Sequence, residues 1–182
     1  MSAQAFALFD SPIGSCGIAW NARGIAGFHL PLTTAQATRA RLEQRWAGAV
    51  ESAPPPGVQR VIERVLALLN GEAIDLTDIP VDIADAPEFH RKVYEVARTI
   101  PPGKTMTYGE IAKRLGVPHE SREVGQALGR NPIAIIVPCH RVLGADGKMG
   151  GFSASGGVAT KRRILEIEGA AALSAGPLFE QR

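Results

Sequence analysis

Apolar and polar residues alternate in short runs near the start of the chain. The apolar runs lie at 6–9, 15–20 and 25–30, and turn-forming segments separate them at 11–14 and 21–24. Runs of this length bounded by glycine, proline and asparagine are typical of strands. Because the connections are short, each strand can pair with the next in antiparallel order. The pattern predicts a three-stranded antiparallel β-meander.

Helical spacing of apolar residues replaces this alternation further along. We expect helices over residues 34–46, 58–69 and 87–100. A proline-rich break at 53–57 separates the first two, and Pro101-Pro102-Gly103 ends the third.

The connecting segment at 76–84 is the predicted domain boundary. We expect an N-terminal domain over residues 1–80 and a C-terminal domain over residues 81–182. Strands and helices mixed in this way predict an α/β protein, with the meander in a small N-terminal α/β unit.

Two short helices joined by a tight turn are predicted in the C-terminal domain. Thr107-Tyr108-Gly109-Glu110 matches the capping box, in which the threonine hydroxyl and the glutamate carboxylate satisfy backbone N–H groups. The first helix should cover residues 108–115, and Gly116-Val117-Pro118 should then turn the chain. Ser121 can cap a second helix that ends near Gly129. This is helix-turn-helix spacing, which occurs in DNA-binding proteins and in other helical proteins.

A tight hairpin is predicted after these helices. Asp146-Gly147 suits the two central positions of the turn, and Val142-Leu143 and the residues after Lys148 flank it. A helix-turn-helix followed by a hairpin is the outline of a winged helix.

A cysteine follows the longest apolar run of the C-terminal domain. Residues 133–137 read as a buried strand that Pro138 ends, which places Cys139 at the mouth of the strand beside His140. A free cysteine is more often an inert apolar side chain, but an adjacent base can activate its thiol, whose reference pKa is about 8.5. The two side chains point apart along an extended segment, so we expect a water molecule to relay the proton.

The helix predicted at 157–168 places a carboxylate where it can serve this pair. At 100° per residue, Glu168 falls on the same face as Ile164 and Leu165 and should point inward. A buried carboxylate needs a partner, and His140 would provide one. The alternative is a frayed helix end with Glu168 in water. Cysteine, histidine and glutamate could equally serve a hydrolase, because nucleophile, base and orienting group are the same three roles.

Composition narrows the class of protein. The two cysteines, Cys16 and Cys139, are too few for a disulfide framework, and the four histidines lack metal-ligand spacing, so we expect no metal and no cofactor. Neither a secretory leader nor a membrane-spanning run is present, which predicts a cytoplasmic protein. The net charge is +2 and the second half is mildly basic, which is compatible with a nucleic-acid-binding face.

Several of these segments together resemble one known family. Asn131-Pro132, the signature Pro138-Cys139-His140-Arg141, a glycine-rich loop and Glu168 are similar to the active-site pattern of the O6-alkylguanine-DNA alkyltransferases, the methylated-DNA–protein-cysteine methyltransferases. The likeness is close over residues 89–169 and weak over the meander. It implies an N-terminal α/β roll and a C-terminal winged-helix-like DNA-binding domain.

The resemblance also implies a reaction. An alkyl group would pass irreversibly from O6-alkylguanine in double-stranded DNA to Cys139, which consumes the protein in one turnover. The partner would be damaged duplex DNA, with O4-alkylthymine as a further candidate substrate, and we expect a monomer. His140 and Glu168 would activate the thiol, Tyr108 would help rotate the nucleotide and offer its proton to the guanine, and Asn131 would brace the turn around the cysteine.

Other roles carry over by position. Arg122 would fill the gap left by the extruded base. The remaining residues expected at the DNA are Tyr108, Ser121, Gln126 and Arg141. Those expected at the substrate pocket are Val137, whose carbonyl would read the guanine amino group, Phe152, Ser153, Ser155 and Gly156. Either loop serine could donate to the guanine oxygen.

This sequence departs from the family pattern at two places. Phe152 stands where the family often has tyrosine, in a loop longer than the shortest family version, and Glu123 follows Arg122, so we expect its carboxylate to angle away from DNA phosphates. Two rival functions also fit parts of the chain. A winged-helix DNA-binding regulator would not need the thiol, and a Cys-His-Glu hydrolase would not need DNA.

Overall fold

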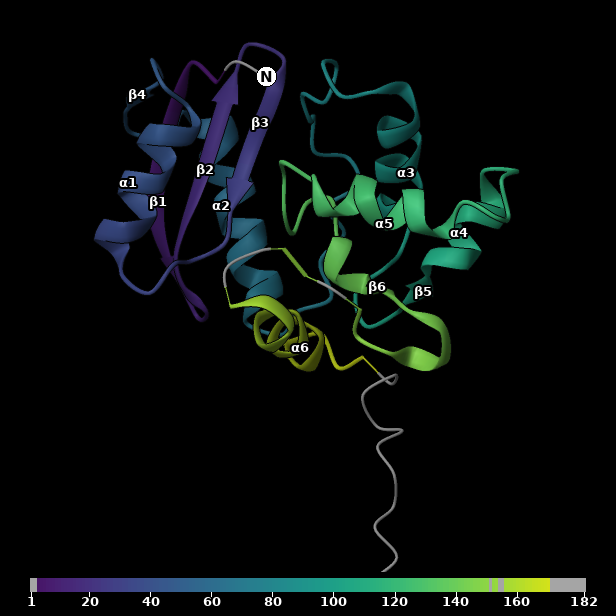
Figure 1. Cartoon of the computed structure of the whole chain (residues 1–182). Coiled ribbons are helices and arrows are strands. Elements are labelled where there is room, and N and C mark those ends of the chain that lie inside the picture. The colour runs from purple at the N-terminus through teal and green to yellow at the C-terminus, as the bar shows by residue number, and fades with distance from the viewer. Residues whose placement is uncertain (1–2, 151, 154–155, 171–182) are drawn as a thin grey trace, which may run out of the picture.

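The N-terminal half is built on a four-stranded sheet. A computed structural model describes residues 3–150, 152–153 and 156–170 of the 182-residue chain. The strands of this sheet are β1 (Ala5–Ser11), β2 (Gly14–Asn21), β3 (Gly24–His29) and β4 (Val50–Glu51). Their spatial order is β3-β2-β1-β4 (Figure 1). The antiparallel meander is therefore confirmed, whereas β4, which pairs in parallel with the start of β1, is too short to have left a pattern.

Two helices cover opposite faces of the sheet, α1 (Ala35–Arg45) and α2 (Pro56–Leu69). Successive strand residues point to opposite faces, so on β1 Phe6 joins the apolar cluster under α1 and Ala7 joins the larger cluster that includes α2. Thr34 caps α1, because its hydroxyl oxygen accepts a hydrogen bond from the backbone N–H of Ala37 (3.0 Å).

The C-terminal half is mostly helical. Its helices are α3 (Glu88–Arg98), α4 (Tyr108–Arg114), α5 (Ser121–Gly129) and α6 (Gly157–Ile167). The predicted capping box begins α4, since the hydroxyl of Thr107 accepts from the N–H of Glu110 (3.1 Å) and the Glu110 carboxylate accepts from the N–H of Thr107 (2.6 Å). The helices α4 and α5 pack together as the helix-turn-helix. Ser121 begins α5, but the capping position is Glu120 and its side chain makes no cap bond, so the predicted serine cap is wrong.

The predicted hairpin forms only its turn. Asp146 and Gly147 both have positive φ, 58° and 70°, and Gly144 N–H donates to the carbonyl oxygen of Lys148 at 2.7 Å. No strand follows Lys148 among the described residues up to 150. The first flank, β6 (Val142–Leu143), instead pairs in parallel with β5 (Met106–Thr107). On one edge β6 is paired with β5, and the carbonyl oxygen of Val142 in β6 accepts a hydrogen bond from Lys161.

The predicted strand at 133–137 is wrong, although its residues are buried or half-buried. The segment is a turn in which Ile135 has a φ of 69°. Asn131 closes this turn with its side chain, which donates to the carbonyl oxygen of Val137 (2.8 Å) and accepts from the N–H of Ile133 (3.0 Å). An unbroken apolar run reports burial, and here a side-chain amide supplies the hydrogen bonds that a neighbouring strand would have supplied.

The two halves share one apolar core. Phe28 at the outer edge of the sheet bridges Ile133, and Ile25 bridges Val81. The largest cluster of buried side chains runs from the sheet through α2 to α3, α4 and α5. The boundary between residues 80 and 81 stays a prediction, since packing is continuous across it.

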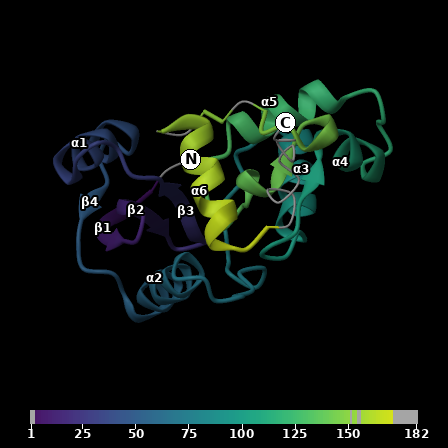
Figure 2. The ribbon, with the colours of Figure 1, turned by 90° about the horizontal axis from the view of Figure 1, so that it is seen from below.

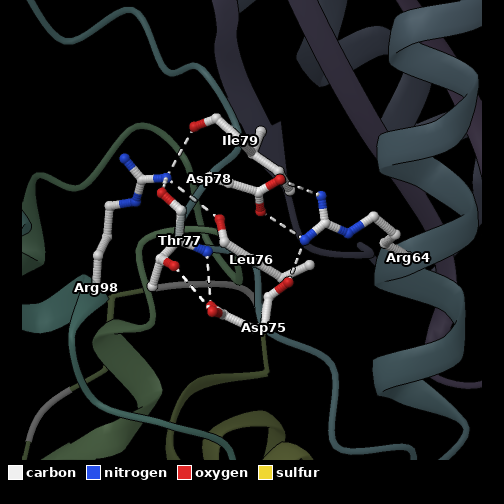
Figure 3. A network of polar contacts seen from close by, with 7 residues as sticks. All are labelled: Arg64, Asp75, Leu76, Thr77, Asp78, Ile79 and Arg98. Carbon is white, nitrogen blue, oxygen red and sulfur yellow. Dashed lines mark hydrogen bonds and ion pairs between the residues drawn. The ribbon is translucent and has the colours of Figure 1, made fainter.

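Arginines from both halves hold the connecting segment (Figure 3). Arg64 of α2 donates to both carboxylate oxygens of Asp78 (3.1 and 2.6 Å) and to the carbonyl oxygen of Asp75. Arg98 of α3 donates from the other side to three backbone carbonyl oxygens, those of Leu76, Thr77 and Ile79. Each half of the chain is therefore hydrogen-bonded to the same connecting segment.

Candidate active site

Cys139 begins a single turn of 3-10 helix, Cys139–Arg141, directly after Pro138. Cys139 is 9% exposed and lines a cavity of about 540 Å³. Cys16 is fully buried in the core of the sheet. Asn131 closes the turn before Cys139 and so helps to place this cysteine at the cavity wall. As the sequence predicted, Cys139 stands at the end of an apolar run.

The thiol of Cys139 is protonated in the resting protein. Burial raises its pKa, while a hydrogen bond from the Asn131 side chain and the positive charge of Lys161 lower it in part. A buried thiol with a raised pKa is a poor nucleophile until a base removes its proton. The site therefore needs a base beside Cys139.

His140, Glu168 and Arg141 form a buried polar network behind this cysteine. The imidazole Nε2 of His140 lies 2.9 Å from Oε1 of Glu168, and both side chains are within 1% of full burial. Arg141 holds the same carboxylate through Nε to Oε2 (3.0 Å) and Nη2 to Oε1 (2.8 Å), and its Nη1 donates to the carbonyl oxygen of Ile100 (2.6 Å). The prediction that Glu168 points inward to His140 is confirmed.

The charges in this network follow from its contacts. Burial raises the pKa of Glu168, but the hydrogen bonds and charges of His140 and Arg141 outweigh it and lower the pKa to about 2. Burial lowers the pKa of His140, although Glu168 raises it in part. Glu168 is thus ionised and accepts the Nε2 proton of His140, and when the imidazole is neutral its Nδ1 can take a proton.

Arg141 does not lie where the sequence placed it. We expected it at the DNA, but the residue is 5% exposed and its guanidinium is used by Glu168 and Ile100. Its role is to keep Glu168 charged.

Tyr108 forms part of the cavity wall opposite this network. It is the first residue of α4 and is half-buried, and burial raises the pKa of its phenol, followed by the negative charge of Cys139. The phenol therefore keeps its proton and can donate it. Gly125 of α5 lies against the ring, and Gly150 lies against the hydroxyl, where a Cβ atom would come within 3.1 Å.

The predicted pocket residues are only partly brought together. Phe152 and Ser153 line the cavity, and the Ser153 hydroxyl donates to the carbonyl oxygen of Gly129 (2.8 Å). The carbonyl oxygen of Val137 already accepts from Asn131 Nδ2 and from the N–H of Cys139 (2.8 Å each), so reading a base would require one of these bonds to open. Gly156 adopts a φ of 79° as the cap of α6 and is not part of the lining. Ser155 lies outside the described residues.

The helix α5 presents a face of small and polar residues. Arg122, Gly125, Gln126 and Gly129 follow the spacing of one helical face, and the first and third side chains are exposed. Ser121 and Glu123 are also exposed. Small residues on such a face permit close approach of another backbone.

Sequence reasoning missed Lys161. This lysine of α6 is fully buried, and its ammonium group donates to the carbonyl oxygen of Val142 at 2.5 Å. It lies 5.8 Å from the ring centroids of both Tyr108 and Phe152. Burial lowers its pKa to about 8, and the Cys139 thiolate raises it in part. The signal was present, because Lys161 stands two helical turns before Glu168 and so shares its inward face.

In the parts of the chain that the structure describes, no group of three or more histidines, cysteines, aspartates or glutamates could hold a metal ion. No helix in those parts is long and apolar enough to cross a bilayer.

Comparisons with known proteins place this site in one family. Residues 88–170 match the family model of the 6-O-methylguanine DNA methyltransferase, DNA binding domain. The methylated-DNA–protein-cysteine methyltransferase of Mycobacterium tuberculosis H37Rv is 37% identical over 94% of this chain and 96% of its own length. The chain belongs to the methylated-DNA–protein-cysteine methyltransferase family. A relative from Methanothermobacter thermautotrophicus is 33% identical over 87% of this chain and 81% of its own length.

The likeness extends to the arrangement of the whole chain. The crystal structure of Mycobacterium tuberculosis OGT in complex with DNA superposes with a TM-score of 0.74 at 34% identity, covering 93% of this chain and 98% of that one. The α/β N-terminal unit and the helical DNA-binding domain are therefore those of methylated-DNA–protein-cysteine methyltransferases. The protein repairs O6-methylguanine in DNA by transferring the methyl group to a cysteine. A regulator that leaves the thiol unused and a hydrolase that needs no DNA are both rejected by this family membership.

Proposed function

We propose that Cys139 is the cysteine that accepts the alkyl group, in a single irreversible turnover. The observation that carries this assignment is the contrast between the two thiols. Cys139 lines the cavity beside a buried histidine and glutamate, whereas Cys16 is fully buried and burial raises its pKa to about 12. A reacting thiol needs both access and a base.

The transfer can be written with every atom accounted for. His140 takes the thiol proton, through one water molecule, and Glu168 holds the imidazole in the tautomer that can accept it. The sulfur–carbon bond forms as the carbon–oxygen bond breaks, and the electron pair of the broken bond stays on the guanine. Tyr108 donates a proton to the guanine. The proton on His140 passes to solvent, and Tyr108 regains a proton from solvent. The thioether has no carbonyl for water to attack, so the protein is consumed.

DNA would meet the protein along α5. We propose that Arg122 fills the gap left by the extruded nucleotide, because it is exposed at the start of a helix whose face is otherwise small. Ser121 and Gln126 are exposed on the same helix and would contact the backbone or the groove. Tyr108 lies behind Gly125 and would meet the rotating nucleotide.

The substrate and partner follow from the same site. We propose double-stranded DNA that contains O6-alkylguanine, with O4-alkylthymine as a second substrate because it presents the same alkyl–oxygen bond on a ring. The protein should act as a monomer, since one chain supplies the nucleophile, base, acid and helix. We place it in the cytoplasm, and we keep the domain limits at 1–80 and 81–182.

The test is to incubate the protein with a duplex that contains O6-methylguanine and then to weigh the intact protein. We expect one methyl group per chain, located on the peptide that holds Cys139. Cys139→Ser should abolish transfer, and the matched variant Cys16→Ser should retain it. A product yield that exceeds the protein added, or a label on Cys16, would overturn the assignment.

A further inference from the structure

The cavity that contains Cys139 has a second wall, which belongs to the N-terminal half. This wall consists of Phe28 and His29 from β3, Leu30 and Leu32 from the following loop, and Arg41 and Arg45 from α1. On the opposite side the cavity is lined by the end of α5 and by Arg130. The hollow therefore continues from the reacting thiol past the edge of the sheet to α1.

This extension is positively charged. Its lining includes three arginines, Arg41, Arg45 and Arg130, together with His29, and none of the described residues that line it is acidic. Within the described part of the chain, the side chains of Arg45 and Arg130 make no hydrogen bond or ion pair, and the guanidinium of Arg41 donates only to the neutral side chain of Gln44 (3.1 Å).

The remaining arginine of α1 provides the contrast. Arg39 forms an ion pair with Glu51 at the other edge of the sheet and does not line the cavity. The helix thus neutralises the arginine that faces β4 and leaves uncompensated the two that face the cavity. Burial and the charge of Arg41 both lower the pKa of Arg45, and burial together with Arg45 and Arg41 lowers that of His29. A bound anion would relieve this repulsion.

We infer that Arg41 and Arg45 bind backbone phosphates of the DNA strand that carries the damaged base, so that the N-terminal half contacts the substrate. The helix α5 lines the same cavity through Gly125 and Gly129. Figure 2 shows α1 and α5 along the same side of the molecule, with the start of α6 between them. A strand that leaves α5 on this side passes α1.

The chemistry of the wall favours phosphate over the alternatives. A guanidinium matches phosphate through paired hydrogen bonds, and it stays charged at any physiological pH. An alkyl substituent of the base would be better served by apolar residues than by two guanidinium groups. The inference rests on the function proposed above, since it requires DNA at α5.

The test compares two double variants that lose the same charge. Arg41→Gln/Arg45→Gln removes the two cavity arginines, and Arg39→Gln/Arg60→Gln removes two arginines that lie outside the cavity. Methyl-transfer rates from duplex DNA and from the free O6-alkylguanine base are measured for each variant at several salt concentrations.

We expect the duplex-to-free-base rate ratio to fall several-fold for the cavity variant and to stay at the wild-type value for the control. The affinity of each variant for duplex DNA is measured at the same salt concentrations. The slope of log affinity against log salt should decrease in magnitude by about two for the cavity variant, because each lost phosphate contact removes roughly one released counterion. Backbone amides of residues 28–45 should also exchange more slowly when the wild-type protein binds DNA.

Three results would overturn the inference. Equal losses in both double variants would mean that only overall charge matters. Equal losses on duplex and free base would mean that the wall belongs to the base or alkyl pocket. No protection of residues 28–45 by DNA would mean that α1 does not approach the strand. A failure of the proposed function itself would look different, because the wild-type protein would then transfer nothing to Cys139.

Discussion

Arg141 grips Glu168 through two parallel hydrogen bonds, Nε to Oε2 at 3.0 Å and Nη2 to Oε1 at 2.8 Å, in the buried interior behind the reacting thiol. The pair explains why the carboxylate stays ionised although burial opposes it. An ionised Glu168 in turn fixes which nitrogen of His140 bears the proton. Arg141 is therefore a positioning residue that acts on Cys139 through two others.

Removing Arg141 should destabilise the protein. Arg141→Met leaves the Glu168 carboxylate without its guanidinium partner, and breaking a buried ion pair in this way costs about 3–5 kcal/mol. Urea unfolding measures the loss. As the control, Arg162→Met on the exposed side of α6 should change the free energy of unfolding by less than about 0.5 kcal/mol. Similar losses in the two variants would contradict the role given to Arg141.

Stability should fall in acid in two stages. Burial lowers the pKa of His140 in the folded protein, so the unfolded chain gains a proton first as the pH drops below about 6.5, and folding weakens there. Glu168, with a pKa of about 2 when folded and 4.5 ordinarily, contributes stability above 4.5 that is lost as the pH falls toward 2.

Unfolding curves recorded from pH 8 down to pH 3 test this order. The Glu168 contribution should amount to roughly 3 kcal/mol, since each pKa unit is worth about 1.4 kcal/mol. Glu168→Gln should flatten the lower stage. A wild-type curve that stays level between pH 7 and pH 4 would show that the network does not carry these charges.

The buried lysine should serve reactivity and not stability. Lys161→Met removes an ammonium group that has no carboxylate partner among the described residues, so we expect no loss of stability at pH 7. It also removes a positive charge that lowers the pKa of Cys139. If that pKa rises by one unit, the thiolate fraction near neutral pH falls about tenfold.

The pH dependence of transfer from free O6-alkylguanine measures this effect. The alkaline midpoint of the rate should move upward in Lys161→Met and return toward the wild-type value in Lys161→Arg, which keeps the charge. An unmoved midpoint in the methionine variant, with a lower rate at every pH, would indicate a purely structural lysine.

Arg122 should matter only when a duplex has to be opened. Arg122→Ala should slow transfer from duplex DNA by at least about tenfold, because unstacking a base costs a few kcal/mol, and it should affect the free base far less. Arg114→Ala, which removes an exposed charge from the neighbouring helix α4, is the matched control. Equal losses on both substrates would rule out the gap-filling role.

The sequence predicted elements that local rules determine. The meander follows from short apolar runs between turn residues, and the capping box at Thr107 follows from two side chains three positions apart. Helical periodicity placed Glu168 inward, and applied one step further it would have placed Lys161 there as well. In these cases one helix or one turn contains all the information.

The errors arose where a distant segment decided the outcome. The run at 133–137 is buried whether it is a strand or a turn, and it is held as a turn by the side chain of Asn131 together with backbone hydrogen bonds within the run. The strand β6 pairs with β5, which is far away in the chain and gave no signal in the sequence beside the predicted turn. Arg141 looked like a DNA contact because the sequence cannot show that Ile100 and Glu168 enclose it.

The burial and raised pKa of the Cys139 thiol matter for a protein that would react only once. A thiol that is 9% exposed and held protonated by its surroundings reacts slowly with peroxide and with stray electrophiles, which prefer open thiolates. In the reaction proposed above, this thiol reacts with the alkyl carbon that a substrate brings into the cavity, after His140 has taken its proton. Each molecule thereby stays available until it meets the lesion, and the number of folded chains in a cell sets the number of lesions that the cell can repair before it makes more protein.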